Sequence, residues 1–173
     1  PKIIVTIGGS GSTNPTTVET IFGASISSLI TTQAIEKPVR IISGNILTGK
    51  KVNVEDYLGF YDSTLSIIND EVKRPFLGML SPGSSKTKYS LFNTFISFGS
   101  DLFNFTTSQN GELRAMVPLN AWEKVLPMDI YPNPLYRAIL AKDVEEMEKL
   151  GIWECDDEDF ALCSFACPSK IDV

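Results

Sequence analysis

The first 52 residues alternate short β-branched runs with turn-forming residues, and this spacing constrains the fold more than any other feature. Residues 2–7 and 18–22 are rich in Ile, Val and Thr and are predicted to be strands. Ser25 is a suitable N-cap for a short helix, and a third strand is predicted at 39–42. Strand, helix and strand in so short a space predict a small β-grasp-like module.

The region 53–118 is predicted to be β-rich with irregular pieces. Residues 64–68 and 76–80 have the composition of strands. The segment 89–98 is rich in aromatic residues, and its pattern leaves helix and strand both open.

A hairpin is predicted around Asn110-Gly111. The flanking runs, 102–107 and 112–117, are strand-like, and Asn-Gly tolerates positive φ at both turn positions.

From residue 119 onward the pattern becomes helical. Pro134 suits a first helical position, Asp143 an N-cap, and Gly151 the position after a helix end. A further short helix is predicted to begin at Asp156 or Asp157. The sequence therefore predicts an α+β fold in three parts, 1–52, 53–118 and 119–173.

Charge is distributed unevenly along the chain. The formal net charge is −6, but residues 143–159 carry nine acids and one base, a net of −8. Residues 1–142 carry a net of +2. An acidic end is a poor match for nucleic acid. Two interpretations stay open for it, a solvated helical face and a docking surface for a basic partner.

The absence of histidine excludes several kinds of active site. With no His in 173 residues, Ser-His and Cys-His nucleophile pairs cannot form, and the commonest general base is missing. Three cysteines, an odd number, argue against a disulfide framework. No apolar run approaches the roughly 18–20 residues that span a bilayer, so membrane contact is expected to be peripheral or through a partner. Because Pro1 is not Met, we expect a piece of a longer protein.

Two glycine-bearing segments resemble nucleotide-binding motifs without matching them. Residues 44–51 nearly fit G-x-x-x-x-G-K-[ST], but Lys51 replaces the hydroxyl residue that would bind Mg²⁺. We interpret this segment as a β-turn. Residues 8–12 follow a strand but do not fit G-x-G-x-x-G, so we interpret them as a loop.

Two cysteines, Cys163 and Cys167, match the second half of a ferredoxin cluster motif, C-x-x-x-C-P. The two earlier ligands would fall at Asp157 and Phe160, and phenylalanine cannot bind iron. Cys155 is out of register by two positions. We therefore expect no metal site and interpret the pair as buried helical cysteines. The contiguous acids at 156–159 point in different directions, and no catalytic residue is assigned.

Several segments together resemble the A subunit of the bacterial sodium-translocating NADH:quinone oxidoreductases. They include FLGMLSPG at 76–83 and EDFALCSFACPSK at 158–170. The others are residues 39–44 with Gly49, 57–59, 102–107, 114–118, 123–129 and 135–138. The resemblance runs over nearly the whole chain in order, as expected of a C-terminal fragment of such a protein.

The resemblance carries expectations about fold and role. It implies a soluble-ligand-binding β-grasp module at the front and, at the end, a helical domain like an iron–sulfur domain that has lost its cluster. It implies a peripheral subunit on the cytoplasmic face of the inner membrane, held by sister subunits. Quinone reduction by NADH is coupled there to sodium transport, with redox flavins in sister subunits and a tie to ubiquinone for the full subunit.

Three hypotheses about the fragment follow. In the first it is a docking and structural module, not itself catalytic, with no cofactor of its own. In the second it contributes to a quinone or small-ligand site, for which 89–98 and the front module are the candidates. The third, disfavoured by Asp157 and Phe160, is an iron–sulfur electron carrier.

Overall fold

The computed structural model describes residues 1–31, 38–70, 76, 103–117 and 120–173. Within them the chain forms a mixed α+β structure with one five-stranded sheet and a few short helices. It divides into two compact units, Pro1–Asn110 (unit 1) and Gly111–Val173 (unit 2).

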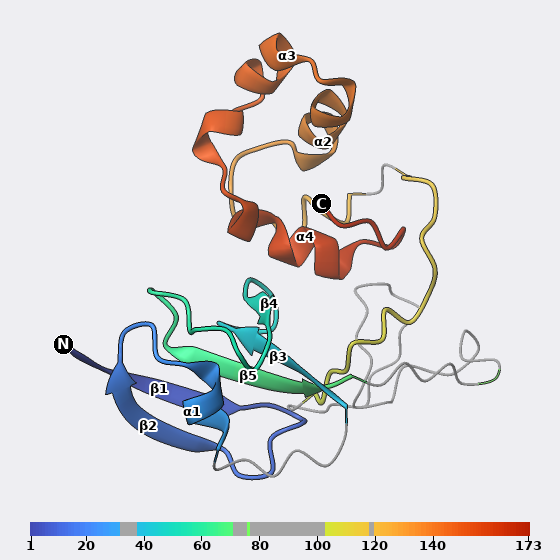
Figure 1. Ribbon diagram of the computed structural model, residues 1–173. Helices are drawn as coiled ribbons and strands as arrows, with labels where there is room; N and C mark the ends of the chain where they lie inside the picture. The colour runs from blue at the N-terminus through green and yellow to red at the C-terminus, as the bar shows by residue number, and fades with distance from the viewer. Residues whose placement is uncertain (32–37, 71–75, 77–102, 118–119) are drawn as a thin grey trace. The chain divides into compact units, whose positions relative to one another are not determined.

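Unit 1 is built on a sheet with strand order β2-β1-β5-β3-β4 (Figure 1). β1 is parallel to β5, and the other neighbouring strands are antiparallel. The strands are β1 (Lys2–Gly8), β2 (Thr16–Ile21), β3 (Val39–Ser43), β4 (Lys50–Val52) and β5 (Thr64–Asn69). The strands predicted at 2–7, 18–22, 39–42 and 64–68 are thus confirmed.

The short helix α1 (Ile26–Ile30) follows Ser25, as predicted, and covers one face of the sheet. Alternation along each strand sends every second side chain toward α1. Val5 and Ile7 of β1 and Leu65 and Ile67 of β5 are 0% exposed. They pack with the buried face of α1 into an aliphatic core.

Unit 2 is helical. It contains α2 (Pro132–Ala141), α3 (Val144–Lys149), the 3-10 helices η2 (Ile152–Glu154) and η3 (Asp157–Phe160), and α4 (Ala161–Ala166). α2 begins two residues before the predicted Pro134, because Pro132 also occupies a position where no N–H is needed.

The predicted caps of α3 are confirmed. The carboxylate of Asp143 accepts a hydrogen bond from the Glu146 backbone N–H at 3.1 Å, and Gly151 has φ 88° just past the helix. The short helix predicted at Asp156 or Asp157 is present too, with Asp156 as the N-cap of η3.

The hairpin predicted around Asn110-Gly111 is wrong. The described residues 103–117 contain no strand, although Asn110 does have φ 53°. Its two flanks bond to different units. Thr107 N–H donates to the Asn69 carbonyl in unit 1, and Arg114 N–H donates to the Ser169 carbonyl in unit 2. These tertiary partners outcompete the local pairing on which the prediction relied.

Between residues 53 and 118, the structure describes residues 53–70, 76 and 103–117. β5 is the strand described between residues 53 and 118. The predicted strand 76–80 lies outside the described residues except for Phe76. The aromatic segment 89–98 lies wholly outside them.

Candidate functional site

The cysteine pair lies in the core of unit 2. Cys163 belongs to α4 and Cys167 caps its end, and the two residues are 0% and 2% exposed. They pack with Trp122 and Leu126. The Cys163 thiol donates a weak hydrogen bond to the Trp122 carbonyl at 3.9 Å. Both cysteines are therefore buried, as the sequence predicted, but only Cys163 is helical, because α4 ends at Ala166 and Cys167 has an extended backbone.

The two positions where the ferredoxin motif would need ligands have separate surroundings. Phe160 packs against the cysteine core as a partly buried hydrophobic residue. Asp157 is exposed at the start of η3. Cys155 lies apart from the pair, and its thiol contacts the Gly151 carbonyl at 3.5 Å. In the described part of the chain, no three His, Cys, Asp or Glu side chains come together as a metal site.

Burial makes the Cys163 thiol a weak nucleophile and a weak metal ligand. It raises the pKa of the Cys163 thiol to about 11, with smaller contributions in the same direction from Glu123 and Cys167. Burial also raises the pKa of Cys155, helped by Asp159 and Glu154. The thiolate is the nucleophile and the metal ligand, so a thiol held neutral is a poor candidate for either task.

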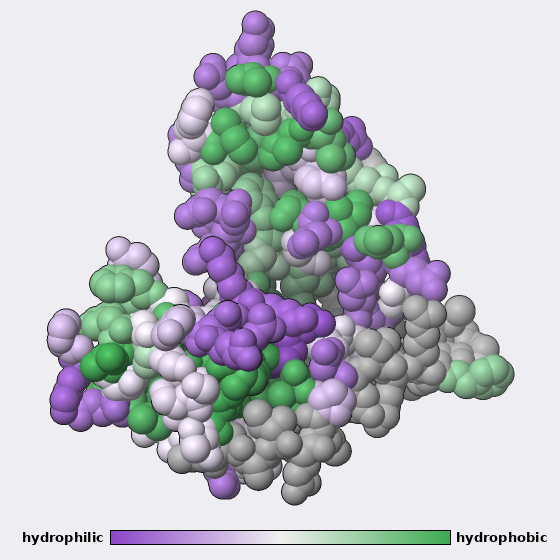
Figure 2. Space-filling model, in the orientation of Figure 1, coloured by the Kyte–Doolittle hydropathy of each residue, from purple (hydrophilic) through white to green (hydrophobic). Residues whose placement is uncertain are grey.

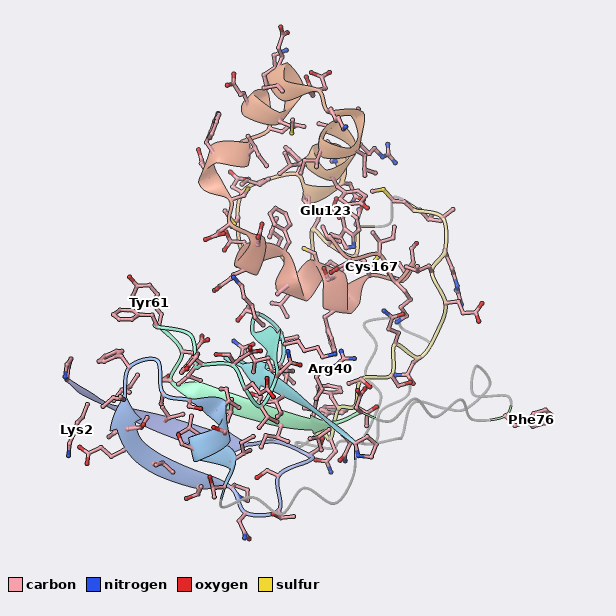
Figure 3. The ribbon with its side chains drawn as sticks, in the orientation of Figure 1. Lys2, Arg40, Tyr61, Phe76, Glu123 and Cys167 are labelled. Carbon is pink, nitrogen blue, oxygen red and sulfur yellow. The ribbon has the colours of Figure 1, made fainter. Side chains whose placement is uncertain are left out.

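A carboxylate that the sequence did not single out lies beside these thiols. Glu123 accepts a hydrogen bond from the Asn133 side-chain amide at 2.5 Å through Oε1. Its Oε2 is buried without a hydrogen-bond partner among the described residues. Asn133 is 8% exposed and stands in the first turn of α2. This contact ties the segment before α2, on which Figure 3 labels Glu123, to the helix.

The segment 44–51 forms a turn and not a phosphate-binding loop. Asn45 Oδ1 accepts hydrogen bonds from the backbone N–H groups of Leu47 at 2.8 Å and Thr48 at 2.9 Å. The Gly49 N–H donates to the Asn45 carbonyl at 3.0 Å. These N–H groups are used within the turn, and strand β4 follows where a P-loop needs a helix. The interpretation as a turn is confirmed.

The glycine loop 8–12 is held against β5. Gly11 N–H donates to the Ile67 carbonyl at 2.9 Å. A Cβ on Gly9 would lie 2.1 Å from the Ile67 carbonyl oxygen, and its φ of +127° also requires glycine. Ser10 Oγ donates to the Phe105 carbonyl at 3.0 Å. The loop therefore joins β5 to the segment after residue 102.

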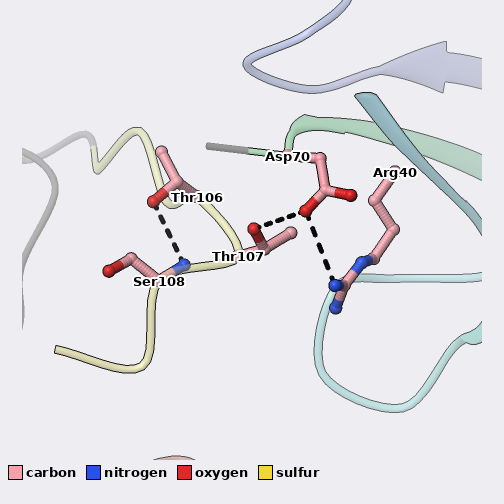
Figure 4. Close-up of polar contacts among 5 residues, drawn as sticks. All are labelled: Arg40, Asp70, Thr106, Thr107 and Ser108. Carbon is pink, nitrogen blue, oxygen red and sulfur yellow. Dashed lines mark hydrogen bonds and ion pairs between the residues drawn. The ribbon is translucent and has the colours of Figure 1, made fainter. Parts of the chain in front are cut away.

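Beside this loop, polar side chains tie the same segment to the sheet (Figure 4). Thr107 Oγ1 donates to Asp70 Oδ1 at 2.7 Å, and the Arg40 guanidinium lies 3.6 Å from the same oxygen. Both ion-pair side chains are 38% exposed. The cluster fixes the chain path, and its exposed ion pair adds little stability.

Three aromatic side chains that sequence reasoning missed gather on the surface of unit 1. The Phe22 and Phe60 rings stack at 5.2 Å, and Phe60 meets Tyr61 edge-on at 5.1 Å. Phe22, Phe60 and Tyr61 are 38%, 63% and 94% exposed, and we call them the aromatic patch. Figure 3 shows Tyr61 projecting away from the sheet, and Figure 2 shows hydrophobic surface at that edge of unit 1. The run Tyr57-Leu58-Gly59-Phe60-Tyr61 was the available signal.

The loop that carries two of these rings is firmly anchored. Residues 53–63, the aromatic loop, hold Leu58 inward at 3% exposure, and its N–H donates to the Ala24 carbonyl at 2.9 Å. Ser43 Oγ donates to Asp62 at 2.5 Å and accepts from the Gly59 N–H at 2.9 Å. Both ends of the loop are thus tied to the sheet and to α1.

The sequence of the chain is similar to one family model and to several known proteins. Residues 4–54 match the family model described as "NQRA C-terminal domain". The chain is 42% identical over 169 residues to the A subunit of the "Na(+)-translocating NADH-quinone reductase" of Pasteurella multocida, covering 96% of this chain and 37% of that protein. Proteins of the same name from Mannheimia succiniciproducens and Hahella chejuensis are 41% and 43% identical over 171 residues. These matches cover 98% and 96% of this chain and 38% of each relative. The chain therefore spans less than two fifths of the relatives' length.

Proposed function

Because the chain belongs to the A-subunit family of the Na(+)-translocating NADH-quinone reductases, we propose that it is a docking and structural part of such a complex. The complex would couple quinone reduction by NADH to sodium transport, with the chemistry in other subunits. The observation that carries this proposal is 42% identity over nearly the whole chain.

The interior of both units supports a structural role. Each unit buries its apolar side chains in its own core. Burial raises the pKa of the Cys163 thiol and so favours its neutral form, and the described residues bring no three metal ligands together. Among the described residues, no helix combines the length and apolar composition needed to cross a bilayer.

The finer features of the fold belong to the same proposal. The five-stranded sheet with α1 supports a β-grasp-like, ligand-binding module for residues 1–52. Strand β5 of the same sheet comes from the region 53–118. The helical unit with its cysteine pair supports a domain descended from an iron–sulfur domain without its cluster. The division into 1–52, 53–118 and 119–173 is kept as part of this proposal.

Membership of the family supports a proposal about where the chain lies in the cell and which proteins it contacts. We place it peripherally, on the cytoplasmic face of the bacterial inner membrane, in contact with sister subunits. We propose that ubiquinone binding belongs to the full-length protein and that this part holds no cofactor by itself.

Truncation of the full-length protein within its complex tests the docking role. A variant lacking these residues would be co-expressed with the other subunits and purified through a tag on one of them. We expect the truncated protein to be lost from the complex, together with sodium-dependent quinone reduction. A complex that keeps both the truncated protein and full activity would refute the proposal. The full-length protein carrying Leu113→Ala, at a 73% exposed position, is the control.

Whether quinone contacts this part of the protein is tested by the fluorescence of its two tryptophans. Trp122 is 3% exposed and Trp153 is 80% exposed. Saturable quenching of the Trp122 fluorescence by a soluble quinone would indicate a site near the core of unit 2. Quenching that rises linearly and is confined to Trp153 would indicate collisions only. Single-tryptophan variants separate the two signals.

Iron analysis tests the third hypothesis. Protein purified without oxygen is expected to be colourless and free of bound iron, because Phe160 occupies one ligand position and packs in the core. Stoichiometric iron with a brown colour would contradict this.

A further inference from the structure

We propose that the aromatic patch, together with the acids of the aromatic loop, is the docking surface for an arginine-bearing, partly apolar segment of a sister subunit. This inference rests on the proposed docking function and names the surface and the partner chemistry. The ring contacts among Phe22, Phe60 and Tyr61 and their exposure carry it.

The patch is large for the surface of one small unit. An aromatic side chain offers roughly 150–250 Å². At the observed exposures, the three rings present on the order of 400 Å² of contiguous surface, comparable with the largest apolar patches of monomeric proteins. Tyrosine, tryptophan and arginine are enriched among the few residues that carry most of the binding energy of protein interfaces.

The patch is also preorganised. Buried packing and hydrogen bonds hold the aromatic loop in place. Leu58 is buried, Ser43 bonds to both Asp62 and Gly59, and the Ile26 N–H donates to the Asp56 carbonyl. A Cβ on Gly59 would lie 2.2 Å from Asp62, so the packing here is tight. Because the loop backbone is already ordered, binding to it costs less conformational entropy than binding to a loose segment.

The negative charge of the aromatic loop favours a positively charged partner. The aromatic loop carries three acids and no base. Glu55 is exposed, while the charged carboxylates of Asp56 and Asp62 also accept hydrogen bonds from the Asn53 N–H and the Ser43 hydroxyl. The bases nearest in sequence, Lys50 and Lys51, stand on edge strand β4. Guanidinium groups stack on aromatic faces and pair with carboxylates, so a segment with arginine matches both features. An anionic membrane surface would instead be repelled by the acids.

Three substitutions of Tyr61 in the full-length protein test the inference. At 94% exposure, none of them is expected to disturb folding. Retention of the variant protein in the purified complex would be measured against dilution and salt. We expect Tyr61→Phe to bind nearly as the wild type, Tyr61→Ala to bind about tenfold more weakly, and Tyr61→Lys more weakly still. Ile4→Ala, at a 64% exposed position on β1, is the matched control and should change nothing.

Each other result has one meaning. Tighter binding by Tyr61→Lys would indicate an anionic partner, such as a membrane, and would overturn the inference. Unchanged retention of all three variants would also overturn it, while the docking function stands. Loss of even the wild-type protein from the complex would refute the proposed function itself.

Photocrosslinking identifies the partner chemistry directly. A benzophenone amino acid would replace Tyr61 in the assembled complex, and the crosslinked peptide would be sequenced by mass spectrometry. We expect a sister-subunit segment containing arginine. A crosslink to lipid, to an acidic segment, or to no partner at all would overturn the inference. The same reagent at Ile4 is the control.

Discussion

The two units fill their cores with different chemistry. Unit 1 buries mainly branched aliphatic side chains from β1, β3, β5 and α1, together with Ala24 and Leu58 from the connecting segments. Unit 2 centres on Trp122, Leu126 and two thiols, surrounded by partly buried neighbours. A core spread over many similar residues is redundant, whereas a core of few unlike residues depends on each of them. The unit with the smaller core should therefore be the one that point mutations break.

The largest expected effect is the loss of the central tryptophan. Trp122→Ala removes the biggest buried side chain of unit 2 and its edge-on contact with Tyr136 at 5.4 Å. We expect about 3–5 kcal/mol of destabilisation, enough to unfold unit 2 while the sheet of unit 1 persists. Urea unfolding followed by probes in each unit would separate the two transitions.

The control for this change is Trp153→Ala, at an 80% exposed position. It should alter stability by no more than about 0.5 kcal/mol. If Trp122→Ala unfolded both units in one transition, their stabilities would be coupled and the contrast drawn between the two cores would fail.

The next largest effect is expected in unit 1, where a substitution at one glycine should lower the free energy of unfolding. Gly9→Ala places a Cβ 2.1 Å from the Ile67 carbonyl oxygen at φ +127°. We expect a loss of more than about 2 kcal/mol, because the loop must move away from β5. Gly8→Ala is the matched control, since a Cβ there meets no atom within 4 Å. Similar stabilities of the two variants, by chemical denaturation, would contradict the close approach.

A smaller effect tests the thiols of unit 2. Cys163→Ser puts a hydroxyl into an apolar site and should cost about 1–3 kcal/mol. Cys155→Ser, at a half-buried position, should cost much less. Thiol labelling at neutral pH should modify Cys155 first and Cys163 only as unit 2 opens. Rapid labelling of Cys163 in the folded protein would show that its site is open.

The raised pKa of Cys163 predicts how the free energy of unfolding depends on pH. The folded pKa of Cys163, about 11, lies above its ordinary value of 9.0. The native state therefore favours the neutral thiol, and this contribution is fully present below pH 9 and is lost as the pH rises toward 11. Unfolding of the wild type between about pH 8 and pH 11, compared with Cys163→Ala, should show a steeper fall for the wild type.

The smallest effect concerns a helix end. Asp143→Ala removes the cap on the Glu146 N–H and should cost about 0.5–2 kcal/mol. Asp143→Asn keeps the accepting oxygen and should retain most of the stability. Equal losses in both variants, measured by thermal unfolding, would indicate that the charge near the helix start matters more than the hydrogen bond.

The sequence by itself determined the elements whose signals are local. β-branched runs located β1, β2, β3 and β5, and Ser25, Asp143 and Asp156 marked helix starts, because strand alternation and caps depend on neighbours in the chain. The cysteine motif could be judged from the sequence too, since the side chain at 160 cannot bind iron.

Only the tertiary structure decided which segments pair across the chain. It placed β5 between β1 and β3. It also set the boundary between the two units at Asn110 and Gly111, because the residues on either side of this pair hydrogen-bond to different units. It also brought Phe22 against Phe60, two residues far apart in the sequence, so that the aromatic run at 57–61 became part of a larger patch. Contacts of this kind depend on how buried faces pack together, and a one-dimensional pattern does not contain that information.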